Sequence, residues 1–99
     1  MIFFEQTISV YRLNIYSTTE QYKLNGQITG MILPVKAEDT MLMEGDPSKQ
    51  FKLVCDVNED LKEADKIVCE GETYIVKTIR VFKLRALERI EAFIYKPNN

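Results

Sequence analysis

The sequence predicts a mainly β protein, a small single-domain antiparallel β-barrel over residues 1–99 with one short helix. Three observations predict this class. The chain has 99 residues, the length of one domain, and 45% of them are hydrophobic, which is enough for a single core. Several short segments are rich in β-branched and aromatic residues, as strands are. Glycine and proline recur inside the second of these segments, where they favour the bends of a small curved barrel.

The first predicted strand covers residues 7–16. Its apolar alternation is imperfect, because Ile8 and Val10 share one face whereas Tyr11 and Leu13 share the other. The strand therefore either changes its buried face at a bulge or is covered on both sides.

The next segments are a bent strand and a short helix. Residues 24–37 contain Gly26 and Gly30, which weaken a central strand and favour a bent or edge one. Residues 38–44 combine early acidic residues with good helix formers, and Gly45 stands where a left-handed helix cap would lie. We expect one or two helical turns there.

The clearest two-residue period comes next. Phe51, Leu53, Cys55 and Val57 alternate with polar residues, which indicates a half-buried strand. A charged connection over residues 58–65 follows.

A strand over residues 66–70 leads into a tight hairpin turn at Glu70-Gly71-Glu72 and then a strand over residues 73–82. The final segment leaves two alternatives open. Apolar residues recur there at helical spacings of three and four, and they are Leu84, Leu87, Ile90 and Ile94. Residues 92–95 instead have strand character, so residues 82–93 could be two hairpin arms with a turn near 84–87.

Composition argues against catalysis. The chain has no histidine, the side chain most used for acid-base chemistry and zinc binding near neutral pH. Cys55 and Cys69 are 14 residues apart rather than in a CxxC pair, and we read them as reduced core residues. We interpret the paired carboxylates as solvated charge in turns, and the pairs are Glu38/Asp39, Glu59/Asp60 and Glu70/Glu72. We therefore expect no enzyme, no cofactor and no metal site.

Targeting signals are also not apparent. The hydrophobic start at residues 1–4 is interrupted by Glu5 and Gln6, and no run approaches the ~18 apolar residues of a membrane span. We expect a soluble, intracellular protein without membrane contact. Residues 1–5 and 97–99 are expected to be flexible ends.

The main charge asymmetry is a basic set within a chain whose formal net charge is −2. Its members are Lys77, Arg80, Lys83, Arg85 and Arg89. On a strand or hairpin, some of these side chains would project together and could touch a phosphate backbone without reading bases. The alternative interpretation is a solvated face.

The order of motifs resembles a known family. I-L-P-V at residues 32–35 is followed by A-E-D-T-M-L-M-E-G-D at 37–46, then K-L at 52–53, then A-D-K-I-V-C-E-G-E-T-Y-I-V-K-T-I at 64–79. This order resembles the head-tail joining proteins of long-tailed bacteriophages, in particular the head-completion or stopper group. Members typically show D-x-I-x-x-x-G-x-x-Y-x-V-x-x-V and an aromatic residue, and these fall here on Asp65, Ile67, Gly71, Tyr74, Val76, Ile79 and Phe82.

The resemblance implies a non-catalytic subunit of the virion neck that joins head to tail and helps to close the DNA channel. Copies would form a homo-oligomeric ring in the virion, even where the free protein is a monomer. Other partners would be connector or adaptor proteins, tail proteins and packaged double-stranded DNA, contacted without sequence specificity. The subunit would lie in the host cytoplasm during assembly.

The resemblance also implies structure. The family is a small barrel, which favours residues 89–96 as a closing strand. The loop at about residues 36–50 would face the channel or a neighbouring subunit, and its contact residues would be Glu38, Asp39, Met41, Leu42, Met43 and Glu44. The basic residues would pair with acidic surfaces of neighbouring subunits.

Two alternatives stay open. The sequence departs from the family pattern at Lys36, Met43 and Pro47, so a tail-side joining (tail completion) protein is one. The other is a small OB-like barrel that binds single-stranded nucleic acid by aromatic stacking and the basic set.

Overall fold

Antiparallel strands make up the architecture. The computed structural model describes residues 6–13, 21–35, 49–83 and 88–97. The strands within them are β1 (Gln6–Leu13), β2 (Tyr22–Pro34), β3 (Gln50–Cys55), β4 (Lys66–Cys69), β5 (Glu72–Phe82) and β6 (Arg89–Tyr95). The predicted mainly β, antiparallel class is confirmed. These residues contain no helix, and the helix predicted over residues 38–44 lies outside them.

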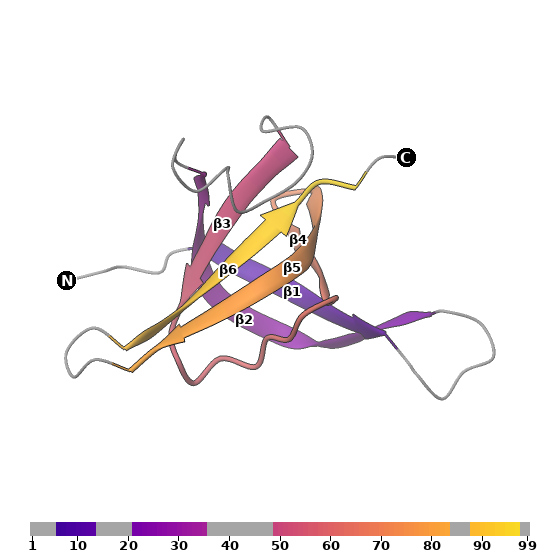
Figure 1. Ribbon diagram of the computed structural model, residues 1–99. Coiled ribbons are helices and arrows are strands. Elements are labelled where there is room, and N and C mark those ends of the chain that lie inside the picture. The colour runs from indigo at the N-terminus through magenta and orange to yellow at the C-terminus, as the bar shows by residue number, and fades with distance from the viewer. Residues whose placement is uncertain (1–5, 14–20, 36–48, 84–87, 98–99) are drawn as a thin grey trace.

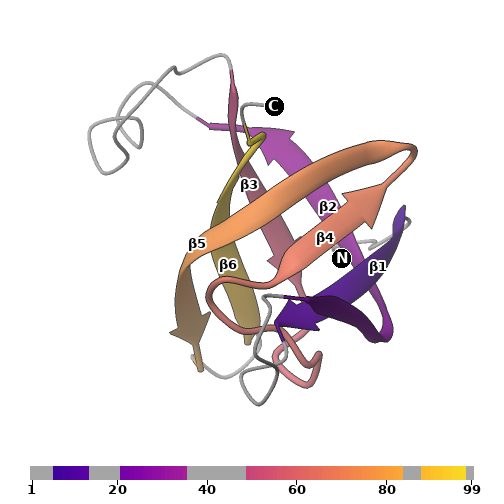
Figure 2. The same ribbon diagram turned by 90° about the vertical axis from the view of Figure 1, so that its right-hand side faces the viewer.

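The strands pair in the order β1-β2-β3-β6-β5-β4, and β4 pairs in turn with β1, so the ladder closes as a barrel. Figures 1 and 2 show the strands wrapping around one interior. The β4–β1 joint is short, with Ser9–Tyr11 opposite Lys66–Val68. The β1–β2 ladder is much longer, and its far end extends beyond the rest of the barrel (Figure 1). We call this extension, residues 11–13 and 22–24, the arm.

Apolar side chains from every strand fill the interior. Eight of the described core residues are at most 1% exposed, namely Ile8, Val10, Leu53, Cys55, Ile67, Val76, Ala92 and Ile94. Full burial of one such aliphatic side chain is worth about 1.5–3 kcal/mol, so this set provides the main driving force for folding. Cys55 and Cys69 are free and buried, which confirms their interpretation as core residues.

Strand β3 is more buried than its two-residue period predicts. Leu53 and Cys55 point into the core as expected, but Val54 between them is only 8% exposed. Val54 pairs with Met31 on one side and Glu91 on the other, in the middle of the sheet. The prediction of a half-buried strand is therefore wrong for this stretch, because neighbours also cover the second face.

A bulge lies beside β1, in its partner strand. The register pairs Val10 with Gly26 and Tyr11 with Leu24, which leaves Asn25 of β2 as the extra residue. Of the two alternatives predicted from the sequence, a bulge is present, but its extra residue lies in β2. The prediction that β1 changes its buried face there is wrong, because the inward face continues from Ile8 and Val10 to Arg12. Beyond the bulge, Tyr11 is half-buried.

Gly30 is the point at which β2 changes partners. It pairs with Gln6 of β1 and with Cys55 of β3, so both ladders meet there. A Cβ atom at this position would lie 2.9 Å from Leu53 Cδ1 and 2.9 Å from the Val54 carbonyl oxygen. Only glycine permits this close approach, which turns the corner of the barrel as the sequence predicts.

The predicted hairpin between β4 and β5 is confirmed. Its two turn residues, Glu70 and Gly71, have φ values of 51° and 81°. Two consecutive positive φ angles are the pattern of a type I′ turn, whose twist matches that of the flanking strands.

The C-terminal segment is a strand, and the helical alternative is wrong. Phe82 pairs with Arg89, so β5 and β6 are the two arms of a hairpin. Ile90, Ala92 and Ile94 are each at most 5% exposed and share the inner face at two-residue spacing. Strand β6 lies between β3 and β5 and completes the core. The stability gained from this packing exceeds the local preference of these residues for a helix.

We predict that Gly30→Ala destabilises the protein by about 1–3 kcal/mol, because the added methyl group meets backbone that cannot move without disturbing β3. Urea denaturation followed by far-ultraviolet circular dichroism measures the change. Thr29→Ala, at the adjacent exposed position, is the control. Equal unfolding midpoints for the two variants would show that β2 and β3 do not approach so closely.

Candidate interaction surface

The predicted channel or interface residues, Glu38 to Glu44, lie outside the described residues. Their anchor points are described. Leu33 pairs with Lys52 and Pro34 with Phe51, so the chain leaves β2 and enters β3 from neighbouring positions. The described residues that flank 36–48 therefore lie at one end of the barrel.

The predicted basic set lies on the β5–β6 hairpin. Lys77, Arg80 and Lys83 are exposed, Arg89 is half-buried, and Arg85 falls outside the described residues. The structure thus brings the described members onto one hairpin, but it gives them different surroundings.

Arg89 belongs to an ion-pair cluster. Its Nε donates to Glu91 Oε2 at 2.6 Å, and Lys52 Nζ lies 3.5 Å from Glu91 Oε1. Burial alone would raise the pKa of Glu91, but the hydrogen bond from Arg89 and the charge of Lys52 hold it below its usual value. Arg89 also lies over the Phe82 ring at 4.6 Å. This cation is committed to contacts within the sheet.

Arg80 is held in a similar way. Its guanidinium carbon lies 5.3 Å from the centroid of Phe93, a ring that is only 3% exposed. In the register Arg80 stands opposite Glu91. Within the basic set, Lys77 and Lys83 are therefore the described residues whose charges are most accessible to a partner.

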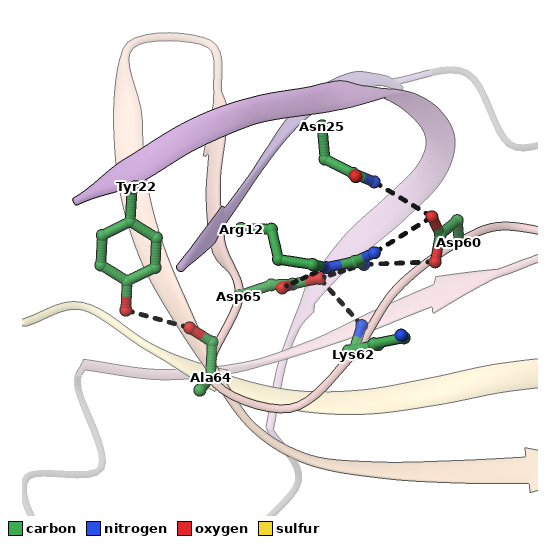
Figure 3. A network of polar contacts seen from close by, with 7 residues as sticks. All are labelled: Arg12, Tyr22, Asn25, Asp60, Lys62, Ala64 and Asp65. Carbon is green, nitrogen blue, oxygen red and sulfur yellow. Dashed lines mark hydrogen bonds and ion pairs between the residues drawn. The ribbon is translucent and has the colours of Figure 1, made fainter. Parts of the chain in front are cut away.

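The strongest polar network of the described residues was not predicted from the sequence. Asp65 is 2% exposed, and it accepts two parallel hydrogen bonds from Arg12, Nε to Oδ1 at 3.1 Å and Nη2 to Oδ2 at 2.9 Å (Figure 3). The backbone N–H of Lys62 also donates to Oδ2, at 2.9 Å. A buried carboxylate needs such partners, because an unpaired charge there would be very costly.

The same guanidinium holds a second carboxylate. Arg12 Nη1 donates to Asp60 Oδ2 at 3.1 Å, and Asn25 Nδ2 donates to the same oxygen at 3.1 Å. The hydrogen bonds from Arg12 and then Asn25 lower the pKa of Asp60, although its side chain is 62% exposed. Asn25 is the bulge residue of β2, so the network links both strands of the β1–β2 hairpin to the connection between β3 and β4.

That connection also continues the sheet. Ala64 N–H donates to the Val76 carbonyl at 2.8 Å, and Val76 N–H donates to the Asp65 carbonyl at 2.9 Å. Tyr22, from the arm, donates its hydroxyl hydrogen to the Ala64 carbonyl at 3.0 Å (Figure 3). Ala64 has a φ of 72°, a left-handed conformation that these bonds maintain.

Some sequence signals for this network exist. Arg12 follows Ile8 and Val10 at two-residue spacing, so the pattern of β1 places a cation where the next inward residue would be. The exposure of Asp60 agrees with its interpretation as solvated charge, but its hydrogen bonds to Arg12 and Asn25 do not follow from the sequence pattern. Glu59 likewise accepts a hydrogen bond, from the Thr29 backbone N–H at 2.7 Å. No local pattern specifies which of several carboxylates pairs with Arg12.

One face of the arm is apolar. In the register Tyr11 pairs with Leu24 and Leu13 pairs with Tyr22, and paired residues share a face. Lys66 of β4 pairs with Tyr11, and its ammonium lies 5.2 Å from the Tyr11 ring and 5.3 Å from the Tyr22 ring. Leu24 is 63% exposed, the highest value among the exposed large hydrophobic residues that the structure describes. We call these five side chains the arm face.

A hollow of about 370 Å³ lies between the ends of β2, β3, β4 and β5. Phe51 and Tyr74 meet there edge to face, with ring centroids 5.4 Å apart. Lys96 lies over both rings and pairs with Glu72 at 3.3 Å. Burial raises the pKa of Tyr74. The described lining therefore combines apolar contact with two carboxylates, Glu70 and Glu72, of which Glu72 pairs with Lys96.

Among the described ranges, no group of three or more cysteine, aspartate or glutamate side chains is arranged to hold a metal ion. Nor does that part of the chain contain a helix with the length and apolar character needed to cross a membrane.

Comparison of the chain with models of known protein families finds no match, and comparison with curated proteins finds none either.

We predict that Arg12→Met lowers the free energy of unfolding by about 2–3 kcal/mol, because it leaves the Asp65 carboxylate buried without its charged partner. This loss of stability is smaller than that expected on breaking a fully buried ion pair, because the Arg12 side chain is 26% exposed. Urea denaturation at neutral pH measures the loss. Lys77→Met, an exposed cation, is the control and should change stability by about 0.5 kcal/mol or less. Equal losses in both variants would contradict the role of the pair.

We predict that neither cysteine reacts with Ellman's reagent in the folded protein at pH 8, whereas both react in urea. Burial, followed by the charges of Glu59 and Asp56, raises the pKa of Cys55 to about 12. Because this pKa exceeds the usual 9.0, the stability from the neutral buried thiol is complete below pH 9 and is lost between pH 9 and about 12. Cys55→Ala should reduce this alkaline loss. Rapid labelling of the native protein would contradict the prediction.

Proposed function

We propose that this protein is a non-catalytic structural subunit of a long-tailed phage or prophage neck, which joins head to tail and helps to close the DNA channel. The observation that carries the proposal is the ordered run of motifs from residue 32 to Phe82. Several of its residues occupy positions on which the barrel depends. Asp65 accepts the Arg12 hydrogen bonds, Gly71 forms the β4–β5 turn, and Tyr74 and Val76 are core residues. The residues that carry the resemblance are therefore ones that the barrel needs for its structure, in addition to following the family's order.

The position of the strand ends that flank residues 36–48 is the second support. These residues connect the paired ends of β2 and β3, so a barrel held rigidly in a ring would present this segment at one end. The segment has four acidic residues against one lysine, which would repel the DNA backbone rather than grip it. Such a lining suits a channel through which DNA must move.

The described basic residues favour this function over single-stranded nucleic-acid binding. Arg89 pairs with Glu91, and Arg80 lies over Phe93. Of the rings on this hairpin, Tyr74 and Phe93 are buried, whereas Tyr95 and Phe82 are half-buried and Phe82 lies beneath Arg89. A stacking platform needs exposed rings beside open cations, which the described β5–β6 hairpin does not combine.

The test is electron microscopy of this protein mixed with purified portal and adaptor assemblies. We expect an additional ring of density at the distal end of the adaptor. Binding only to isolated tails would identify the tail-side alternative, and binding to neither would overturn the proposal. A single-stranded oligonucleotide titrated at low salt provides the second arm. Affinity that disappears in the Lys77→Glu/Lys83→Glu variant would support the nucleic-acid alternative instead.

A further inference from the structure

We propose that the arm face binds residues 37–46 of a second copy of this chain. The inference deepens the proposed function, because it names the two surfaces through which copies would meet. It rests on the chemistry of the arm face, on the complementary composition of residues 37–46, and on the distance between them within one copy.

The arm face combines apolar surface with positive charge. Leu24 is largely exposed, and the adjacent Tyr11 and Leu13 are half-buried. The ammonium of Lys66 lies over the tyrosine rings at the edge of this surface. Within the described residues of β1 and β2 there is no acidic side chain, and on the reverse side of the arm Lys23 lies beside Arg12, which is paired with Asp65 and Asp60. The best-matched occupant is an apolar segment flanked by carboxylates.

Residues 37–46 have this composition. Their apolar centre is Met41, Leu42 and Met43, and the acidic residues around it are Glu38, Asp39, Glu44 and Asp46. Methionine side chains adapt to irregular apolar surfaces and make favourable contacts with aromatic rings, which the arm face supplies through its two tyrosines. Carboxylates beside the apolar centre would meet the ammonium of Lys66 at the edge of the arm face.

In one copy, the described residues that anchor the segment lie on the opposite side of the barrel from the arm. The arm lies at the start of β2 and the segment follows its end, and the strand's 13 residues separate them by up to about 40 Å. Figure 1 shows the two ends of β2 on opposite sides of the barrel. A segment anchored at both Val35 and Lys49 extends at most roughly 25 Å from its anchors. This placement favours a segment from another copy as the occupant.

The contact that results is head-to-tail. Each copy offers one arm face and one segment, so two different surfaces meet and each copy can contact two neighbours. Contacts of this kind close into rings or continue as open filaments, depending on the rotation between copies.

The test uses two variants of the full-length chain. Leu24→Glu places a charge in the arm face, and Met41→Ser/Leu42→Ser/Met43→Ser removes the apolar centre of the segment. In sedimentation experiments over a concentration series up to about 1 mM, we expect the wild type to self-associate and each variant to do so at least tenfold more weakly. An equimolar mixture of the two variants still contains one intact arm face and one intact segment. It should therefore form a heterodimer and nothing larger.

Val81→Glu is the matched control, since Val81 is 52% exposed on β5 and receives the same charge. It should associate like the wild type, and circular dichroism should show all variants folded. A wild type that stays monomeric throughout, or a mixture that forms no heterodimer, would overturn the inference. Loss of binding to portal or adaptor assemblies by Leu24→Glu, without any change in self-association, would assign the arm face to another protein. Failure of wild-type binding to those assemblies would count against the neck function alone.

Discussion

The pairing of Arg12 with the buried Asp65 carboxylate is the interaction on which the rest of this structure depends. It joins the β1–β2 hairpin to the connection that leads into β4, and the β4–β1 joint beside it is the short seam that closes the barrel. Breaking the pair would leave a charge in the interior, and water cannot easily reach it there. The network therefore contributes specificity as well as stability, because other arrangements of the hairpin would leave Asp65 unpaired.

The network also determines which surfaces face outward. Arg12 lies on the inward side of β1, so the residues on either side of it, Tyr11 and Leu13, lie on the opposite face of the arm. Tyr22 is fixed by its hydrogen bond to the Ala64 carbonyl. The arm is thus a braced extension whose apolar face is presented in a defined orientation. Orientation of this kind reduces the entropy lost when a partner binds.

Charge is used differently in different parts of the molecule. On the β5–β6 hairpin, Arg80 and Arg89 contact rings and carboxylates of the same sheet, and so they stabilise the outer face of the barrel. The acidic residues of 37–46 are separated in sequence from the cations at the arm. Net charge of −2 therefore says little about partners, whereas the position of each charge on the barrel is informative. The proposed assembly depends on that separation.

The sequence by itself determined the strand segments, the β4–β5 turn and the corner at Gly30, because these depend on local φ, on side-chain size and on two-residue alternation. It also identified the buried cysteines. It left the C-terminal segment open, since Leu84, Leu87, Ile90 and Ile94 fit a helix equally well. Only the tertiary structure decided this, because the place for β6 is created by β3 and β5. The Arg12–Asp65 pair and the arm face likewise arise from residues 53 positions apart or on different strands, and no local pattern specifies such contacts.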